Sequence, residues 1–461
     1  MSSADVKPPM PPTVDREPVF LRLLTGINKS YIANFIETSY SMKMGHYWVP
    51  GRNIYMPNLP ELAQKILVSD AEHYPKGDLL SNMLKMLLGN GVFVADGEEW
   101  KQQRRLIDPA FVLARLERVF PLMCDACDDM FERLSAVPDG AEISIDEEMT
   151  HVTADVIFRT MFSTGLSQDG AAKLFAAFAQ FQKSAFVTGF LESTWVPALF
   201  AAGQKRKAKK AGRDIRQLIE PFVRDRFEKV QRGEKLKSED ILSYLAEAED
   251  PDTGARFTFD ELVDQTAFLF LAGHETSASA LSWSLYLLAM RQDIQERVNG
   301  EVHAVAGSRP LQFGHIRKLN FTRNVFREAL RLYPPVGFLP REATREEEIR
   351  GKKIKPRDVM LICPWLIHRH RLVWDNPDVF DPDRFDTENC KHAIKTHAYM
   401  PFSMGPRVCT GAGFATQEAI LLLASLVRTY RFGPAEGHVP RPVGRLTIRS
   451  ENGIRLKLNR R

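Results

Sequence analysis

Phe402-Ser-Met-Gly405-Pro-Arg407-Val-Cys409-Thr-Gly411 is the stretch that says most about the fold of this 461-residue chain. It places Cys409 just before an apolar helical pattern, and a cysteine at a helix N-terminus has its thiolate stabilised by the dipole and by unpaired N–H groups. Gly405 can adopt a turn conformation closed to other residues, and Gly411 lets the backbone approach a flat ligand. Arg407 supplies a fork-shaped donor that suits a carboxylate. These residue types are the ones that a metal-binding thiolate beside an anionic group needs.

The alternative interpretation of the same stretch is a buried structural cysteine beside a turn. Five specified positions in ten residues favour the ligand. The pattern F-x-x-G-x-R-x-C-x-G resembles the haem-binding signature of the cytochrome P450 family, from Phe402 to Gly411. That resemblance implies that Cys409 is the proximal ligand of a b-type haem (heme b). Thiolate ligation of this kind favours O–O cleavage.

Composition is ordinary for a soluble globular protein, with 44% hydrophobic and 26% charged residues. The chain has no internal linker or repeat, so we expect one large domain over residues 21–461, after a proline-rich N-terminus (residues 1–20) predicted to be disordered. The net charge of +4 gives no case for nucleic-acid binding.

The five cysteines are too few, and odd in number, for a secreted disulfide scaffold. Cys124-Asp-Ala-Cys127 lies in a helical pattern, and we interpret it as an inert pair rather than a redox or zinc site. No run reaches the roughly 20 apolar residues that span a bilayer. We therefore expect a cytoplasmic protein, and an unanchored member of the resembled family looks bacterial.

The hydrophobic periodicity is helical for most of the chain after Gly97. Residues 54–67 indicate strands and turns before a helix. A β-rich region is predicted from Arg341 to Leu366, with a hairpin around Gly351 and a strand over 359–363, and further strands over 446–448 and 454–458. The predicted fold is mainly α with a smaller β-rich portion. The resemblance to the P450 layout extends over about residues 94–432.

A long helix is predicted from the capping box Thr258-Phe-Asp-Glu261 to about Met290. In its middle, Gly273 is small enough for close approach of a flat cofactor. The alternative is a crossing between two helices that needs a small residue.

The same helix carries Glu275 and Thr276, and Thr276 can back-bond to the carbonyl of Ala272 and bend the helix. Ala272-Gly-His-Glu-Thr276 resembles the oxygen-activation site of the P450 family. This implies that Thr276 organises the hydrogen-bond network around dioxygen and that Glu275 feeds protons to it.

Glu328-Ala-Leu-Arg331 brings opposite charges together on one helix face. Such a pair is usually a surface ion pair, worth under about 1 kcal/mol. It also resembles the E-x-x-R pair of the P450 family, which a downstream arginine joins, here Arg384. This trio is predicted to be structural.

Trp100-Lys-Gln-Gln-Arg104 places an indole N–H and a guanidinium one helical turn apart. Alone it could be an amphipathic helix with a surface arginine. It resembles the family's W-x-x-x-R motif, which binds a haem propionate, and Arg341 resembles a further propionate-binding position. Arg407 is the third arginine expected there.

An apolar run containing Leu174, Phe175, Phe178, Phe181 and Phe186 leads into residues 190–197. In the resembled fold this region roofs the distal pocket and Val336-Gly-Phe338 lines its side, which implies a lipophilic substrate. The alternative is that these residues are core.

The basic run over residues 205–213 is interpreted as the solvated face of an amphipathic helix. Nucleic-acid binding is the weaker alternative, because the run has no interleaved aromatic residues. A second alternative for the basic run is peripheral contact with an anionic membrane, aided by Trp195 and Phe200.

The motifs together predict a monooxygenase that transfers one atom of O2 to a C–H or C=C bond and the other to water. Peroxygenation or hydroperoxide rearrangement, and a haem sensor or carrier, are the alternatives. No G-x-G-x-x-G follows a strand, so electrons are expected from a ferredoxin-type carrier with a reductase. Arg407, Lys391 and Lys395 predict a basic surface for that carrier. The substrate, the regiochemistry and the oligomeric state stay open.

Overall fold

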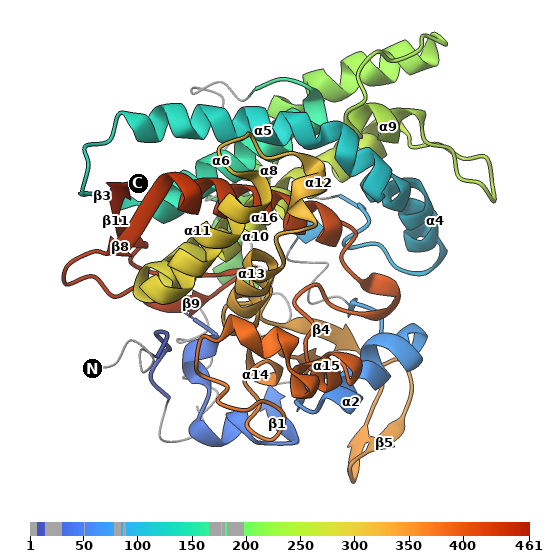
Figure 1. Cartoon of the computed structure of the whole chain (residues 1–461). Coiled ribbons are helices and arrows are strands. Elements are labelled where there is room, and N and C mark those ends of the chain that lie inside the picture. The colour runs from blue at the N-terminus through green and yellow to red at the C-terminus, as the bar shows by residue number, and fades with distance from the viewer. Residues whose placement is uncertain are drawn as a thin grey trace.

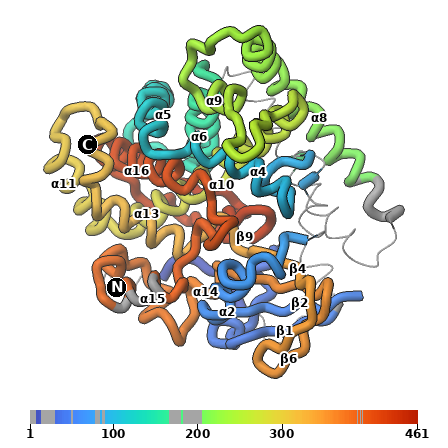
Figure 2. Tube along the Cα trace, turned by 90° about the vertical axis from the view of Figure 1, so that its right-hand side faces the viewer, coloured from blue at the N-terminus to red at the C-terminus, as the bar shows by residue number. Residues whose placement is uncertain are grey.

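The computed structural model describes residues 7–13, 30–49, 51–77, 84–85, 89–165, 177, 180–181 and 198–461. Long helices form the larger part of the described chain, and strands β1, β4 and β5 gather at one lower edge (Figure 1). The view turned by 90° shows β1, β2, β4 and β6 together on that side, below the helices (Figure 2). The mainly α fold with a smaller β-rich portion is therefore confirmed.

The helices are α2 (Pro60–Gln64), α4 (Gly97–Ile107), α5 (Leu113–Ser135), α6 (Ile145–Phe162), α8 (Ala198–Gln231), α9 (Ile241–Glu247), α10 (Phe259–Met290), α11 (Gln292–Ala306), α12 (Phe313–Ile316), α13 (Asn320–Leu332), α14 (Pro364–Ile367), α15 (Glu388–Lys395) and α16 (Ala412–Thr429). Short single-turn helices are η2 (Ile32–Asn34), η3 (Glu37–Tyr40), η4 (Lys65–Ser69), η5 (Ala71–His73), η6 (Asp108–Phe111), η7 (Pro382–Asp386) and η8 (Gly405–Arg407).

The strands are β1 (Met44–Val49), β2 (Arg52–Pro57), β3 (Ala141–Ser144), β4 (Leu339–Glu342), β5 (Glu347–Ile349), β6 (Lys352–Ile354), β7 (Val359–Ile362), β8 (Tyr430–Pro434), β9 (Pro442–Gly444), β10 (Ile448–Ser450) and β11 (Arg455–Arg460). They form a four-stranded sheet β1-β2-β7-β4, a three-stranded sheet β3-β11-β8 and the pairs β5-β6 and β9-β10. The predicted hairpin is present, with Gly351 in its turn at φ +72°. The strand predicted over 446–448 begins instead at Ile448.

Helix α10 runs through the centre of the fold and is buried along nearly its whole length. The capping box predicted at its start is present, with Thr258 Oγ1 accepting from the Glu261 N–H and the Glu261 carboxylate accepting from the Thr258 N–H. Because the helix is apolar on most sides, it can pack against several neighbours at once. It therefore fixes the position of every residue that it carries relative to the rest of the core.

Gly273 has a different role from the cofactor approach expected of it. A Cβ at this position would lie 2.8 Å from Cδ1 of Ile157 on α6, which is closer than side chains pack. The hydroxyl of Thr153 on α6 also donates to the carbonyl of His274 at 3.0 Å. The small residue is therefore needed for the crossing of α6 and α10, which is the alternative that the sequence left open, whereas approach of a cofactor to Gly273 stays a prediction.

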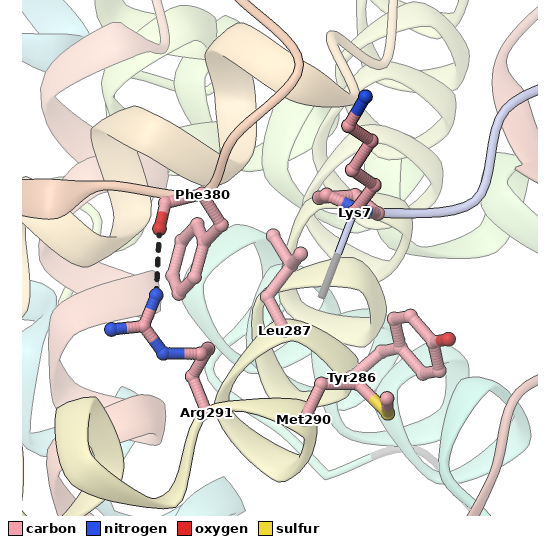
Figure 3. Close-up of a pocket in the computed structure, with 7 residues that line it drawn as sticks. Lys7, Tyr286, Leu287, Met290, Arg291 and Phe380 are labelled. Carbon is pink, nitrogen blue, oxygen red and sulfur yellow. Dashed lines mark hydrogen bonds between the residues drawn. The ribbon is translucent and has the colours of Figure 1, made fainter. Parts of the chain in front are cut away.

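The N-terminal residues 7–13 lie against the C-terminal end of α10. The hydroxyl of Tyr333 donates to the carbonyl of Pro9 at 2.7 Å. A cavity of about 10 Å³, the size of one water, lies among Lys7, Pro8, Tyr286, Leu287, Met290, Arg291 and Phe380 (Figure 3). Residues 1–6 and 14–20 of the segment predicted to be disordered lie outside the described residues.

Cys124 and Cys127 lie on α5, as the helical pattern predicts. Burial raises the pKa of the Cys124 thiol to about 11 and that of Cys127 to about 12, so neither is a reactive thiolate at neutral pH. Among the residues that the structure places, no group of three or more His, Cys, Asp or Glu side chains could hold a metal ion. In the same described part of the chain, no helix is long and apolar enough to cross a bilayer.

Candidate functional site

Two backbone hydrogen bonds build the loop around Cys409. The N–H of Cys409 donates to the carbonyl of Phe402 at 2.9 Å, and the N–H of Val408 donates to that of Gly405 at 3.0 Å. Gly405 has φ +71°, and a side chain there would collide with the carbonyl oxygen of Leu67. The loop therefore requires a glycine at position 405 for both reasons.

Cys409 lies three residues before α16, and its side chain is exposed, whereas the other four cysteines are buried or half-buried. Protein atoms still surround the sulfur closely enough that burial raises the pKa of the thiol, while a backbone hydrogen bond from Gly411 and the charge of Arg104 act in the opposite direction. A Cβ on Gly411 would meet nothing nearer than this sulfur, at 3.9 Å. The sulfur is thus accessible, and a coordinated cation would supply the remaining stabilisation of the thiolate.

Arg407 points inward, over the indole ring of Trp100, with the guanidinium carbon 4.0 Å from the ring centroid. It donates to the carbonyl of Ala95 at 2.8 Å and forms an ion pair with Asp96. Burial lowers the pKa of Arg407 to about 10. The expectation that Arg407 contributes to a basic docking surface is therefore wrong, because its side chain is largely covered.

Lys76 and Arg341 are both buried next to Arg407, and no motif in the sequence indicates Lys76. The Lys76 ammonium lies 3.7 Å from the Phe93 ring centroid and contacts the Phe93 carbonyl oxygen. Arg341 donates to the carbonyl of Pro340 at 2.8 Å. Burial lowers the pKa of Lys76 well below its usual value and that of Arg341 to about 10, and the charge of Arg407 lowers both further.

We call Lys76, Arg341 and Arg407, with Asp96, the Lys76 cluster. Asp96 is the carboxylate that acts on all three cations, and it is already in the ion pair with Arg407. Buried charges in proteins are normally paired. The surplus of positive charge therefore fits an anionic group, and the two carboxylates of a haem are such a group.

Arg104 lies one turn after Trp100 on α4 but takes a different set of partners. It forms a salt bridge with Asp108 at 3.0 Å and donates to the carbonyl of Val408 at 2.9 Å. Arg104 therefore ties α4 to the cysteine loop. The W-x-x-x-R motif thus places its tryptophan beneath Arg407 and its arginine beside the residue before Cys409.

Thr276 and Glu275 point to different partners. The hydroxyl of Thr276 donates to the carbonyl of Ala272 at 2.7 Å, which is the back-bond predicted from the sequence. The buried Glu275 carboxylate accepts from the Thr447 hydroxyl at 2.7 Å and from Arg449 at 2.5 Å. Nothing in the sequence indicates these two partners, since they lie more than 170 residues downstream.

Glu328, Arg331 and Arg384 form the predicted trio, which we call the Glu328 cluster. Arg331 donates to both oxygens of Glu328 at 2.8 Å, and Arg384 donates to one of them at 3.3 Å. Glu328 and Arg331 are fully buried, so this is not the surface pair that the i, i+3 spacing alone would favour. Both arginines also donate to carbonyls of residues 368–379, the segment leading to η7.

Of the phenylalanine-rich run, Phe181 is described and fully buried. Leu174, Phe175, Phe178, Phe186 and residues 190–197, which include Trp195, lie outside the described residues, as does the side chain of Phe200. Val336 is 36% exposed, and Phe338 packs edge-on against Tyr31 with ring centroids 4.8 Å apart. The basic residues of 205–210 lie on the exposed side of α8, whose Ala208 and Ile215 are buried, as an amphipathic helix requires.

Comparison with known proteins places this chain in a protein family. A sequence model described as Cytochrome P450 matches residues 11–457, nearly the whole chain.

Three curated relatives come from a bacterium and a plant. Cyclooctatin synthase of Streptomyces melanosporofaciens is 32% identical over 397 residues, which are 86% of this chain and 84% of the relative. Cyclooctat-9-en-7-ol 5-monooxygenase of the same organism is 28% identical, with 83% and 81% covered. Cytokinin hydroxylase of Arabidopsis thaliana is 32% identical, with 86% and 77% covered.

Proposed function

Because this chain belongs to the cytochrome P450 family, and is therefore a haem-thiolate monooxygenase that uses O2 and an electron-transfer partner on a lipophilic substrate, we propose that Cys409 is its haem ligand. The observation that carries this assignment is the exposed sulfur at the start of α16, close to a buried surplus of positive charge. When bound, the thiolate-ligated haem supplies O2 activation and O–O cleavage.

The Lys76 cluster and Trp100 hold the haem propionates in this proposal. Arg341 and Lys76 have few protein acceptors, so each can donate to a propionate without giving up an existing ion pair. Arg407 stays stacked on Trp100 and shares its charge between Asp96 and the propionates. Phe402 and Gly411 lie on the loop beside the sulfur, where a flat ring system can approach. Arg104 keeps α4 attached to that loop.

Thr276 and Glu275, both on α10, take part in proton transfer in this proposal. The Thr276 hydroxyl is held at the Ala272 carbonyl, where it can pass a proton along α10. Thr276→Ala should lower the ratio of product formed to NADPH consumed by more than it changes substrate affinity, and should raise peroxide release. Thr276→Ser, which keeps the hydroxyl, is the matched control. Equal coupling in all three proteins would confine Thr276 to a role in bending the helix.

The electron donor is a ferredoxin-type carrier reduced by a separate reductase. Val408, Val112 and Leu113 are exposed around the cysteine loop, 39–50% by surface area, and offer an apolar contact. Lys391 is exposed and paired with Glu388, so it can exchange that partner for an acidic carrier. Lys391→Glu should weaken carrier-dependent turnover most at low salt, whereas Lys237→Glu, on the loop after α8, should not. Turnover with NADPH and the purified chain alone would contradict the proposal.

The five unpaired cysteines support a cytoplasmic, reducing location, since secreted proteins usually oxidise theirs. The relatives' names suggest the first compounds to test, and cyclooctat-9-en-7-ol is one of them. A shift in the ferric haem absorption on adding this compound would support it as a substrate.

A further inference from the structure

The pair β9-β10 lies between α10 and the segment expected to line the substrate pocket. The N–H of Ile448 donates to the carbonyl of Pro335 at 2.9 Å, and Ser279 of α10 hydrogen-bonds the Ile448 carbonyl. A Cβ on Gly337 would lie 2.7 Å from Cδ1 of Ile448. The start of β10 is therefore fixed against both elements, and its neighbours have defined positions.

Thr447 and Arg449, on either side of Ile448, both bind the carboxylate of Glu275. Thr447 Oγ1 donates to Oε1 at 2.7 Å, and Arg449 Nη2 donates to Oε2 at 2.5 Å. Arg449 is itself braced by α6, because its Nη1 donates to Thr150 Oγ1 at 3.3 Å. Each oxygen of the carboxylate therefore has its own donor, from the residue before β10 and from β10 itself.

The charged environment of Glu275 comes from two elements. Arg449 is the cation that β10 supplies, and His274, on α10 itself, has Nε2 4.0 Å from Oε2. Burial lowers the pKa of His274, so its imidazole is neutral at neutral pH. From α6 the neighbour is the uncharged Thr150, through Arg449. Arg449 thus supplies a permanent positive charge to this arrangement.

We infer that Arg449 and Thr447 are positioning residues that hold Glu275 ionised on the side of α10 that faces β9-β10. Proton delivery begins when the Glu275 carboxylate breaks its hydrogen bonds to these two residues. This inference rests on the proposed role of Glu275 as a proton carrier. A carboxylate must take up a proton before it can donate one, and a neighbouring guanidinium favours the ionised form. The pair β9-β10 therefore determines how readily the Glu275 carboxylate takes up the proton that it later donates.

The direct test is an infrared titration of the Glu275 carboxyl in the holoenzyme, taken as the difference from Glu275→Gln. Removing the guanidinium removes the stabilisation of the ionised form, so Glu275 keeps its proton to higher pH. Arg449→Gln should move the midpoint up by roughly 1–3 pH units. Thr447→Val should move it less, and Arg449→Lys should restore most of the wild-type value. Arg441→Gln, which removes an arginine paired with Glu451 just before β9, is the control and should leave it unchanged.

Turnover gives the second readout. If the protonated carboxyl is the donor, the ratio of product formed to NADPH consumed should fall at high pH. In Arg449→Gln the pH of this fall should rise by the same amount as the titration midpoint. A midpoint that coincides with the wild type would overturn the inference, and so would full coupling in Arg449→Gln without any pH shift. If Arg449→Gln does not fold, Thr447→Val decides, and a midpoint equal to that of the wild type would then overturn the inference. Unchanged coupling in Glu275→Gln would instead refute the proposed role of Glu275, whatever the titration shows.

Discussion

The Glu328 cluster and the Lys76 cluster both contain buried arginines, but the number of hydrogen-bond acceptors around the buried charge differs between them. Arg331 makes five hydrogen bonds, two to Glu328 and three to backbone carbonyls. Arg341, which is also buried, makes one within the described part of the chain, to the carbonyl of the residue before it. Burial lowers the pKa of Arg341 to about 10, because few protein acceptors compensate the loss of water.

The difference indicates what each cluster is for. A buried ion pair with all its donors satisfied needs nothing further and serves to hold chain segments together. A buried cation without enough acceptors costs stability unless a ligand supplies them. The Glu328 cluster therefore completes the fold, whereas we propose that an anionic ligand completes the Lys76 cluster.

The largest effect is expected from breaking the Glu328 cluster. Glu328→Gln leaves Arg331 and Arg384 without their carboxylate in a site closed to water, so the free energy of unfolding should fall by about 3–5 kcal/mol. Urea denaturation measures this. The control is Asp383→Asn, whose partner Arg297 is half exposed and whose loss should cost under about 1 kcal/mol. Equal losses in the two variants would mean that the Glu328 cluster is no more than a surface pair.

The Lys76 cluster should respond through the ligand rather than through the fold. If Arg341 binds a propionate as proposed, Arg341→Met removes a charge-assisted hydrogen bond worth about 1.5–3 kcal/mol, so haem should leave roughly 10- to 100-fold faster. Transfer of haem to an acceptor protein measures the rate. The same substitution should leave the unfolding free energy of haem-free protein equal or higher, since it removes an unsatisfied cation. A lower unfolding free energy of the haem-free protein together with unchanged haem release would contradict the assignment of the Lys76 cluster.

Glu418 on α16 offers a third, smaller test of the rule that unsatisfied buried charge is costly. Neither carboxyl oxygen has a hydrogen-bond partner among the described atoms, and burial raises the pKa of Glu418 to about 8, against a partial opposing effect of Ser277. In the unfolded chain the carboxyl ionises near its ordinary pKa, so between those values the folded state holds an extra proton. Wild-type stability relative to Glu418→Gln should therefore fall by roughly 1 kcal/mol per unit from about pH 5 to pH 7. Urea denaturation at several pH values measures it, and a constant difference would contradict it.

The sequence predicted the parts of the site that lie in contiguous motifs. The cysteine loop, the capping box of α10, the back-bond of Thr276 and the joining of Arg384 to the E-x-x-R pair are all present. In each case a local spacing determines the geometry, or a short pattern carries the resemblance.

Residues brought in by tertiary packing could not be predicted. Lys76 is a single lysine after a proline, and its role depends on Arg341 and Arg407, which lie far away in the sequence. Arg449 meets Glu275 because β10 packs on α10. The contact of Gly273 with Ile157 could not be predicted for the same reason, since the periodicity of one helix does not reveal which residue of another helix crosses it.

The central claim is that Cys409, and no other cysteine, binds the haem. The most direct test is the absorption spectrum of the reduced protein with carbon monoxide, measured for the wild type, Cys409→His and Cys363→Ser. The wild type and Cys363→Ser should show the strongly red-shifted Soret band of a thiolate-ligated haem, because Cys363 is fully buried. Cys409→His should lose that band. A wild-type spectrum typical of histidine ligation, or a red-shifted band that survives in Cys409→His, would contradict the claim.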